Sequence, residues 1–554
     1  LTGTLFSEFA LTLAGAVVVS GLIALTLSPM MCSKILRPLK EQGKAADWVD
    51  AQFHRLDRIY RRGVDACLAN RGAVWLFAGV IFLSLPMSFL LAQRELAPEE
   101  DNASIFVFAS PPDYANIDYV NAYTQQMIDL WRTIPEIRTA WQVNQQDQIF
   151  GGLELKLWDE RERHQSEIIA EAQQKYSTVA GLEIYTFAWA ALPGVDSGLP
   201  VNFVVASTDD YAQLEQVAEE LLAKARESGK FIFVNKSLRH SRPELKVHID
   251  REQAAALGVE MPEIADTLQT LLGDGEVSRF AIEGRTYRVI PQAADDFRLS
   301  GSNLSQYYVR SLSGQMIPLS SVISVSTIVQ PNVRSQYQQL NSITIQGMMM
   351  PPNTLGDGLQ FLEQELKNIA PKGYRAGYEG ESRRYVQEGN SFLFLFGASL
   401  ILIYLVLSAQ FNSFRDPLVV LVSVPLSLFG ALLPLALGWE TLNIYTQVGL
   451  LTLVGLIAKH GILIVDFANR LEQEGKDRFE AVAEAATMRL RPILMTTFAT
   501  VLGVLPLLLA NGAGAASRFA MGLMIAAGMC VGTLFTLFVL PTFYPRLGRA
   551  QSSQ

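Results

Sequence analysis

The sequence predicts an α-helical membrane bundle of seven spans, interrupted by one large α+β domain that lies outside the membrane. Apolar runs of about 20 residues, the length that crosses a bilayer, occur twice before residue 92 and five times after residue 390. The segment between residues 93 and 387 holds no such run and has the composition of a globular domain. Lys and Arg gather in alternate connecting loops, as the positive-inside rule requires of a chain that crosses repeatedly.

The composition also excludes several classes of function. Of 554 residues, 49% are hydrophobic and 18% are charged, and the formal net charge of −9 argues against nucleic acid as a partner. The three cysteines are Cys32, Cys67 and Cys530, which lie in or beside apolar runs. They form neither a disulfide framework nor a zinc spacing, so we expect no metal and no cofactor.

The first span is predicted at residues 1–36 and the second at 73–92, joined by a basic linker at 37–72. In this linker Trp48, Phe53, Leu56, Ile59 and Tyr60 recur at helical spacing opposite the charges. The pattern fits a helix lying on the cytoplasmic membrane surface and equally an ordinary solvated amphipathic helix. The positive charge places the linker in the cytoplasm, so the second span runs outward.

The soluble segment alternates short β-like runs with amphipathic helices in two cycles. This pattern predicts ferredoxin-like split βαβ subdomains at residues 93–250, completed by 331–387. Residues 251–330 break the second cycle and are predicted to be an insertion. Within the insertion, residues 277–291 carry the Glu283-Gly284 turn signal of a hairpin.

Five further spans are predicted within residues 388–546, at 391–408, 418–437, 446–469, 492–510 and 519–544, followed by a cytoplasmic tail at 547–554. Seven spans and a cytoplasmic carboxyl terminus place the first residue outside, which requires a spanning segment upstream. The first span (7–29) also resembles the last (517–541), and internal repeats are typical of transporters. We therefore expect this chain to be the second half of a larger protein. Sequencing the source DNA upstream of the codon for Leu1 is the first test of this expectation.

Lys459 lies near the middle of an apolar stretch at residues 449–469. An ionised lysine at that depth costs several kcal/mol unless a partner or water relieves it, which favours a functional charge over a structural one. Asp466 lies two turns away, and the other spans offer no central Asp or Glu. A segment absent from this chain, or a second subunit, is expected to supply the partner.

Three stretches of the membrane part carry a family resemblance. They are LSAQFNSFRDPLVVLVSVPL (407–426), YTQVGLLTLVGLIAKHGILIVDFAN (445–469) and MRLRPILMTT (488–497). The chain resembles the resistance-nodulation-division (RND) efflux transporters, and among them the hydrophobe/amphiphile (multidrug) type. The resemblance also covers ALGVEMPEIADTLQTLLG (256–273) and SGQMIPLSSV (313–322) in the soluble part.

The resemblance implies a twelve-span fold of which this chain is the sixth span onward. It further implies a homotrimer in the bacterial inner membrane, joined to a periplasmic adaptor and an outer-membrane channel. Inward proton flow would drive the expulsion of amphiphilic compounds. The soluble segments would be porter subdomains and the insertion a docking domain, whose hairpin reaches a neighbouring subunit.

By the same resemblance, Lys459 is a proton-relay lysine and Arg489 and Thr496 occupy further relay positions. For Arg489, an anchoring role at the cytoplasmic edge stays open. For Thr496, a hydrogen bond to its own helix backbone is the alternative. We interpret His460 and Asp466 as edge or packing residues.

One departure from the family pattern concerns the substrate pocket. The loop between the first two porter strands is rich in Gly and Phe in drug pumps, whereas here it corresponds to VNQQDQIFGGLELKLW (143–158), with Phe150 its only phenylalanine. Phe187 and Trp189 are further candidates for the pocket, although each also suits a core position. The run of Met348, Met349 and Met350 is interpreted as flexible packing and not as a copper site.

Other functions are not excluded by the sequence. The chain holds no HExxH, GxSxG, Walker or CxxC motif, which argues against a membrane enzyme. An RND exporter of a narrower substrate (lipid, metabolite or metal), a secretion-accessory or sterol-sensing relative, and a non-coupled half subunit stay open. A trimer that binds a periplasmic adaptor would separate the exporters from the sterol-sensing relatives.

Overall fold

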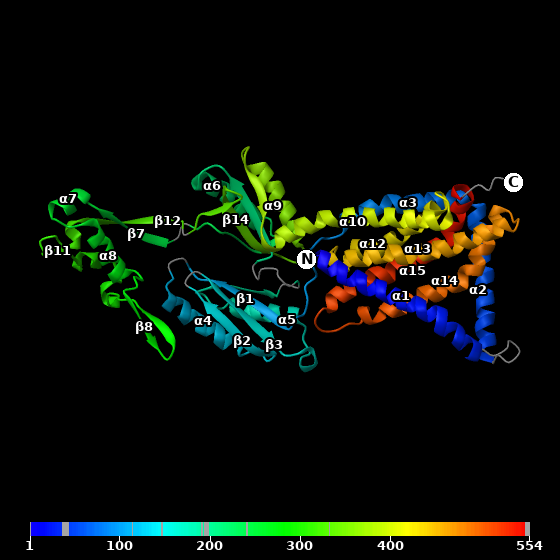
Figure 1. The fold of residues 1–554 in the computed structure, drawn as a ribbon, viewed down its shortest axis with the longest axis horizontal. Coiled ribbons are helices and arrows are strands. Elements are labelled where there is room, and N and C mark those ends of the chain that lie inside the picture. The colour runs from blue at the N-terminus through cyan, green and yellow to red at the C-terminus, as the bar shows by residue number, and fades with distance from the viewer. Residues whose placement is uncertain are drawn as a thin grey trace. The chain divides into compact units, whose positions relative to one another are not determined.

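The computed structural model describes residues 2–35, 44–112, 115–145, 148–189, 192, 199–239, 242–331 and 333–548. These form two compact units. The first comprises Leu1–Pro111, Ile117–Ser237 and Ser335–Gln554, and the second Pro112–Asn116 and Leu238–Arg334 (Figure 1). Most of the predicted tail and the start of the predicted linker lie outside the described residues.

Each predicted span corresponds to a helix of the first unit. In the described part of the chain, seven helices are long and apolar enough to cross a membrane. They are α1 (Thr2–Ile35), α3 (Arg71–Leu91), α10 (Gly380–Phe411), α11 with α12 (Asp416–Leu421 and Ser423–Ala436), α13 (Ile444–Gln473), α14 (Arg478–Leu508) and α15 (Ala515–Leu547).

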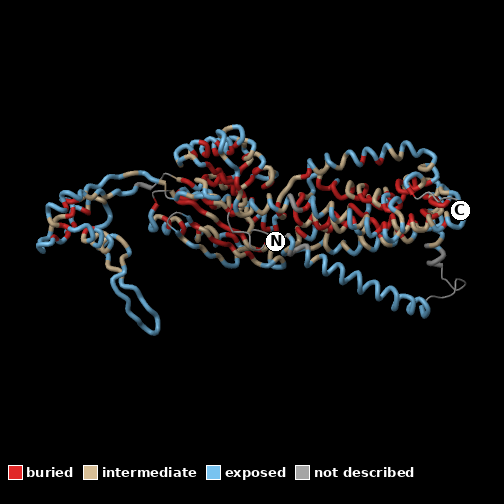
Figure 2. Tube along the Cα trace, turned by 45° about the horizontal axis from the view of Figure 1, so that its top comes forward, coloured by how far each residue is buried: buried red, intermediate tan, exposed pale blue. Residues whose placement is uncertain are grey.

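Helices α12, α13 and α15 form the buried centre of this bundle (Figure 2). Small residues allow their backbones to approach closely, as in membrane helix pairs generally. A Cβ at Gly528 would lie 2.2 Å from Leu453 Cδ2, and one at Gly532 would lie 2.4 Å from Ser427 Cβ. In contrast, α1 is exposed along almost all of its described length.

The basic linker forms helix α2 (Lys44–Ala69), of which only part of the apolar face is free. Val64 and Tyr60 are buried, and the Tyr60 hydroxyl donates a 2.7 Å hydrogen bond to the Leu537 carbonyl on α15. Arg491 of α14 lies over the Phe53 ring and pairs with Asp50 at 3.0 Å. Trp48, Leu56 and Ile59 stay exposed. This helix therefore packs on the bundle through one part of its apolar face and leaves the other part uncovered.

The first sheet is built from β1 (Ser104–Ser110), β2 (Ile137–Asn144), β3 (Ile149–Leu155) and β4 (Glu183–Ala188), with α4 (Ile117–Trp131) and α5 (Gln165–Tyr176) between strands. The strand order is β2-β3-β1-β4 and every neighbouring pair is antiparallel. Most residues of β1 are buried, on both faces of the strand, and Ile149, Leu153 and Ile168 are buried with them in the core of this sheet and its helices.

The second sheet repeats this topology. It is formed by β5 (Val201–Ser207), β6 (Phe231–Lys236), β13 (Ser335–Tyr337), β14 (Leu340–Met349) and β15 (Arg375–Tyr378), with α6 (Tyr211–Glu227) and α9 (Leu355–Ile369). Strands β6, β14, β5 and β15 are neighbours in that order, which is the order of β2, β3, β1 and β4. The βαββαβ pattern therefore occurs twice in the chain.

The second unit holds β7 (Arg242–Ile249), α7 (Arg251–Ala256), α8 (Met261–Leu272), β8 (Ser278–Ile282), β9 (Arg285–Val289), β10 (Tyr308–Arg310), β11 (Met316–Pro318) and β12 (Ile323–Gln330). Its core gathers Ile264, Leu304, Val309, Leu319 and Val322. The predicted hairpin is confirmed, because β8 pairs with β9 across Glu283 and Gly284, both at positive φ. All residues of these two strands are exposed.

Two expectations about the soluble part were wrong. The segment around 244–249, predicted to complete the second sheet, is β7 and pairs instead with β12, from Ile249–Ile323 to Arg242–Gln330. The inserted unit therefore begins at Leu238 and ends at Arg334, wider than the predicted 251–330. Phe150, expected in a loop, lies in strand β3. Gly152 leaves room for the Trp141 ring of β2, and Gly151 lets the backbone of Trp141 and Gln142 approach closely.

Candidate functional site

Two regions of the first unit bring polar groups together, one inside the helical bundle and one where the soluble sheets meet the helix ends. The first is organised by α13, whose start is fixed by a capping box at Asn443. The Asn443 side chain accepts hydrogen bonds from the backbone N–H groups of Tyr445 and Thr446, both at 3.0 Å. Asn443 is fully buried, so this cap holds the first turn of α13 in place.

Lys459 lies on the face of α13 that the described helices leave uncovered, in line with the exposed Gly455. No hydrogen bond or ion pair joins Lys459 to any described residue. The next residue, His460, is 1% exposed. Successive side chains on a helix point about 100° apart, so the same turn presents one cationic group outward and one imidazole into the bundle.

Arg489 lies on α14 beside α13. Its guanidinium carbon is 4.7 Å from the centre of the Phe467 ring, a cation–π contact with α13. The Nε atom of Arg489 is buried and has no hydrogen-bond partner among the described residues. A buried donor without an acceptor costs about 1–3 kcal/mol. An anionic partner for this guanidinium would relieve that cost.

Thr496, seven residues further along α14, contacts both its own helix and His460. Its hydroxyl donates a 2.9 Å hydrogen bond to the Ile493 carbonyl, as the alternative interpretation expected. The same oxygen lies 3.4 Å from Nε2 of His460. The structure thus brings Thr496 to His460, while no described contact joins Lys459, Arg489 and Thr496 to one another.

Of the two interpretations of His460, as an edge or a packing residue, the structure supports packing, because its side chain is buried between α14 and α15. Thr497 of α14 and Thr533 of α15 both lie within 3.5 Å of the ring. Asp466, in contrast, is half-buried and pairs with Arg470 one turn later at 2.9 Å. Asp466 is therefore held by an ordinary i,i+4 pair near the end of the helix.

The second region is a cavity of about 400 Å³ between the two sheets and the helix ends. Phe187 and Trp189, both proposed from the sequence, line it together with Phe106, Met348 and Met349. Phe106 packs against both candidates, with ring centres 5.1 Å from Phe187 and 5.2 Å from Trp189. Phe150 does not line this cavity and packs instead against Trp141.

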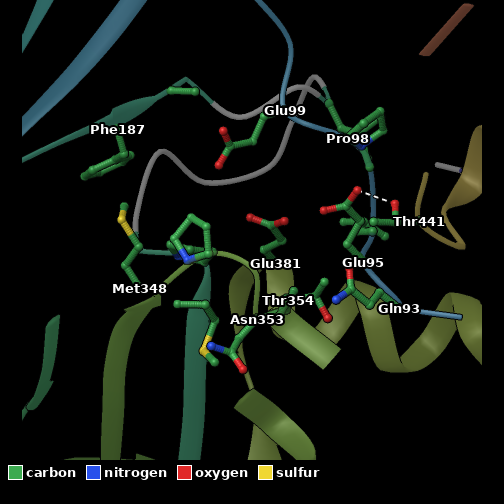
Figure 3. Close-up of a pocket in the computed structure, with 18 of the residues that line it drawn as sticks. Gln93, Glu95, Pro98, Glu99, Phe187, Met348, Asn353, Thr354, Glu381 and Thr441 are labelled. Carbon is green, nitrogen blue, oxygen red and sulfur yellow. Dashed lines mark hydrogen bonds between the residues drawn. The ribbon is translucent and has the colours of Figure 1, made fainter. Parts of the chain in front are cut away.

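Three carboxylates, those of Glu95, Glu99 and Glu381, also line the cavity, and no Lys or Arg is among its described lining residues. Figure 3 shows Glu99 and Glu381 between an end formed by Phe187 and Met348 and an end where Thr441 donates to Glu95. Burial raises the pKa of Glu95 to about 7, outweighing the hydrogen bond from Thr441, and nearby carboxylates reinforce the rise. Burial also raises the pKa of Glu99. The negative charge of this cavity therefore varies with pH near neutrality.

The two residues after Glu99 fasten the first sheet to the bundle. Glu100 is 5% exposed, and its carboxylate accepts hydrogen bonds from the backbone of Ser517 at 2.7 Å and of Ala516 at 3.2 Å. Asp101 pairs with the buried Arg161 and accepts from the backbone of Gln165 at 3.1 Å, at the start of α5. Burial opposes ionisation of Asp101, but Arg161 and the backbone donors hold its pKa below the usual value.

Sequence comparison places these features in a known family. A sequence model of the AcrB/AcrD/AcrF family matches residues 1–547. The chain belongs to this family. It is therefore an RND-family chain, as the membrane motifs indicated, and its relatives are transporters.

Several members of the AcrB/AcrD/AcrF family align along almost the whole chain. An uncharacterized transporter of Haemophilus influenzae is 41% identical over 555 residues, which cover 98% of this chain and 54% of that protein. The toluene efflux pump membrane transporter TtgB of Pseudomonas putida is 31% identical, covering 98% and 53%. The multidrug resistance protein MdtF of Escherichia coli K12 is 31% identical, covering 98% and 54%. The chain thus spans about half the length of the AcrB/AcrD/AcrF proteins it matches.

Two groups of residues in this AcrB/AcrD/AcrF chain could not be predicted from the sequence, because only the fold brings their members together. The partners of His460 come from helices 36 and 73 residues away along the chain. Glu95 and Glu381 meet in one cavity although they are far apart in sequence. A histidine inside an apolar run was the one available signal for the first. No feature of the sequence indicated that Glu95 and Glu381 share a cavity.

Proposed function

We propose that the complete protein to which this chain belongs is a proton-driven exporter of amphiphilic compounds. It would act as the inner-membrane component of a tripartite pump, as a homotrimer joined to a periplasmic adaptor and an outer-membrane channel. The two sheets would be ferredoxin-like porter subdomains on the periplasmic side, and the inserted unit a docking domain. Family membership and the efflux relatives support this proposal.

The observation that carries the proposal is the state of Lys459. A lysine near the middle of an apolar helix, exposed and without a described partner, is costly unless an intramembrane carboxylate pairs with it. Protonating such a carboxylate would remove the attraction and release the lysine, so proton uptake would become a helix movement. Arg489, with a buried donor that lacks an acceptor, and Thr496 would assist at the same site.

The cavity supports the substrate part of the proposal. Its aromatic and thioether lining offers adaptable apolar contact, as pockets for amphiphiles do. Its three carboxylates and its lack of a described cationic lining residue favour amphiphiles that carry a positive charge. The exposed hairpin β8–β9 supports contact with another subunit, because Phe280 and Ile282 lie uncovered on it, 47% and 51% exposed.

The test replaces Lys459 in the complete protein. Lys459→Ala should abolish proton-driven export of ethidium by proteoliposomes while trimer assembly, measured by light scattering, stays intact. Lys476→Ala is the matched control, because Lys476 follows the end of α13 and pairs with Glu484 outside the apolar stretch. Export that persists in Lys459→Ala at the rate of the Lys476→Ala control would reject the relay.

A further inference from the structure

His460 is a buried titratable residue to which the proposed relay assigns no role. It lies on α13, one residue after Lys459, and its imidazole is enclosed between α14 and α15. Only 1% of the residue is exposed, so water does not solvate the ring in the described chain. A buried polar ring needs partners for both nitrogens, because an unmet one costs about 1–3 kcal/mol.

Both nitrogens have hydroxyl partners. Nδ1 lies 3.3 Å from Oγ1 of Thr533, and Nε2 lies 3.4 Å from Oγ1 of Thr496 and 3.5 Å from Oγ1 of Thr497. The oxygens of Thr497 and Thr533 are themselves 3.0 Å apart. These ring contacts exceed the usual 2.7–3.2 Å of an N–H···O bond, so the imidazole is held between the threonines and locked to none of them.

Counting hydroxyl protons fixes the neutral state. Thr496 and Thr497 each donate to the Ile493 carbonyl at 2.9 Å, so neither has a proton left for the ring. They can only accept from His460, which places the imidazole proton on Nε2. Thr533 has no such backbone bond among the described contacts, and its hydroxyl is free to donate to Nδ1. Every partner is then satisfied.

The protonated state keeps a hydrogen-bond partner for every group as well. When a proton is added to Nδ1, the ring donates from both nitrogens, and Thr533 must accept from Nδ1. Its hydroxyl then turns to donate to Oγ1 of Thr497, 3.0 Å away, whose own proton still goes to Ile493. One bond is made to hydrogen at Nδ1, the ring charge changes from zero to +1, and one hydroxyl rotates. No buried group loses its partner in either state.

Burial of the ring disfavours this charged second state, and the charged groups around the ring modulate when it forms. Lys459 is its neighbour on α13, and Arg489 lies on α14, seven residues before Thr496. On the other helices that contact α13, α12 carries no titratable residue and α11 carries only Asp416. In α15 the titratable residues are Arg518, Cys530, Tyr544 and Arg546, and α10 contributes Tyr404 and residues near its start. A positive charge on His460 is therefore opposed by Lys459 and favoured once a carboxylate neutralises Lys459.

We infer that His460 takes up and releases one proton in each transport cycle, with the Thr533 hydroxyl switching between Nδ1 of His460 and Oγ1 of Thr497. This inference rests on the proposed proton-driven export and adds a second protonatable group to it. His460 would carry its charge while Lys459 is paired and lose it when Lys459 is released. His460 would thus be charged only in the states in which a carboxylate neutralises the adjacent Lys459.

The decisive test observes the proton directly. The complete transporter, purified with isotope-labelled histidine, is titrated from about pH 9 to about pH 4 by infrared difference spectroscopy, a range in which imidazole changes charge. The wild type should show an imidazolium signal that is missing from His460→Asn. Thr533→Val should move the midpoint of that signal to about tenfold higher proton concentration, because the charged ring loses the stronger hydrogen bond. Thr533→Ser should restore the wild-type midpoint.

The matched control is Thr536→Val. Thr536 lies on the same helix, is fully buried, and its hydroxyl has no partner among the described residues, so its removal should leave the midpoint unchanged. An unchanged signal in His460→Asn, or an equal shift in Thr533→Val and Thr536→Val, would overturn the inference. Because this readout needs no transport, it stays valid if Lys459→Ala exports normally and the proposed function fails. If export by the wild type depends on Lys459 but its pH profile is the same in His460→Asn, the inference alone is rejected.

Discussion

The Glu100 carboxylate accepts a 2.7 Å hydrogen bond from the backbone N–H of Ser517. Ala516 donates to the same carboxylate at 3.2 Å, so Glu100 satisfies two of the free N–H groups in the first turn of α15. A negative charge at this position also interacts favourably with the helix dipole. The segment between α3 and β1 is thereby fastened to the last membrane helix.

Glu100→Ala should lower the stability of the complete protein by about 1–2 kcal/mol, the usual cost of losing a buried N-terminal cap. Glu100→Gln keeps an accepting oxygen without the charge and should lose less. Thermal unfolding of the detergent-purified protein measures both. Glu99→Ala is the control, because Glu99 is the adjacent carboxylate, lines the cavity and makes no described hydrogen bond to α15. Equal melting temperatures for Glu100→Ala and Glu99→Ala would show that the cap does not hold α15.

Phe187→Ala should weaken the binding of a cationic amphiphile. Phe187 lines the cavity and contacts Phe106, and one lost aromatic contact of about 1 kcal/mol corresponds to an about fivefold higher Kd. Phe150→Ala, in the same sheet but away from the cavity lining, should leave the Kd for ethidium unchanged. Fluorescence polarisation with ethidium measures both variants. If Phe150→Ala weakens binding as much as Phe187→Ala does, the cavity is not the binding site.

The affinity of the cavity for a cation should fall as the medium becomes acidic. The pKa of Glu95 is raised to about 7, so its carboxylate is charged above that pH and neutral below it. Between about pH 8 and pH 6 the Kd for ethidium should rise about fivefold, the effect of losing one nearby charge in a partly buried site. In Glu95→Gln this rise should shrink, and Glu183→Gln, which alters an exposed carboxylate of β4, should retain it. A pH dependence that Glu95→Gln leaves intact would assign the titration to another group.

The elements that the sequence predicted best depend on local pattern. Each apolar run became a helix, because in a bilayer only the helix satisfies the backbone of such a segment from within. The Glu283-Gly284 hairpin followed from two residues that accept positive φ. Helix α6 begins directly after Asp210, a residue type that favours the N-cap position and whose side chain caps the first turn.

The errors arose where distant residues decide the structure. Gly151 and Gly152 have the composition of a loop, yet they lie in β3, where Gly152 makes room for the Trp141 ring and Gly151 for the backbone of the neighbouring strand. Strand β7 has the alternation of any half-buried strand, and only its partner β12 shows that it belongs to the inserted unit. The three threonines around His460 could not be named from the sequence, because they lie on two other helices. A short stretch of sequence carries no signal of contacts between such distant residues.

The inserted unit leaves the second sheet after β6 and rejoins it at β13, and both of these strands pair with β14. Lys236, the last residue of β6, is paired with Ile345 of β14, and the whole Leu238–Arg334 unit lies between them in the chain. Topologically, then, the unit is a loop between two strands that pair with the same edge of β14, grown to the size of a domain. Loops of this kind lengthen at little entropic cost. An insertion at this point can therefore change in size while the second sheet keeps its strand order.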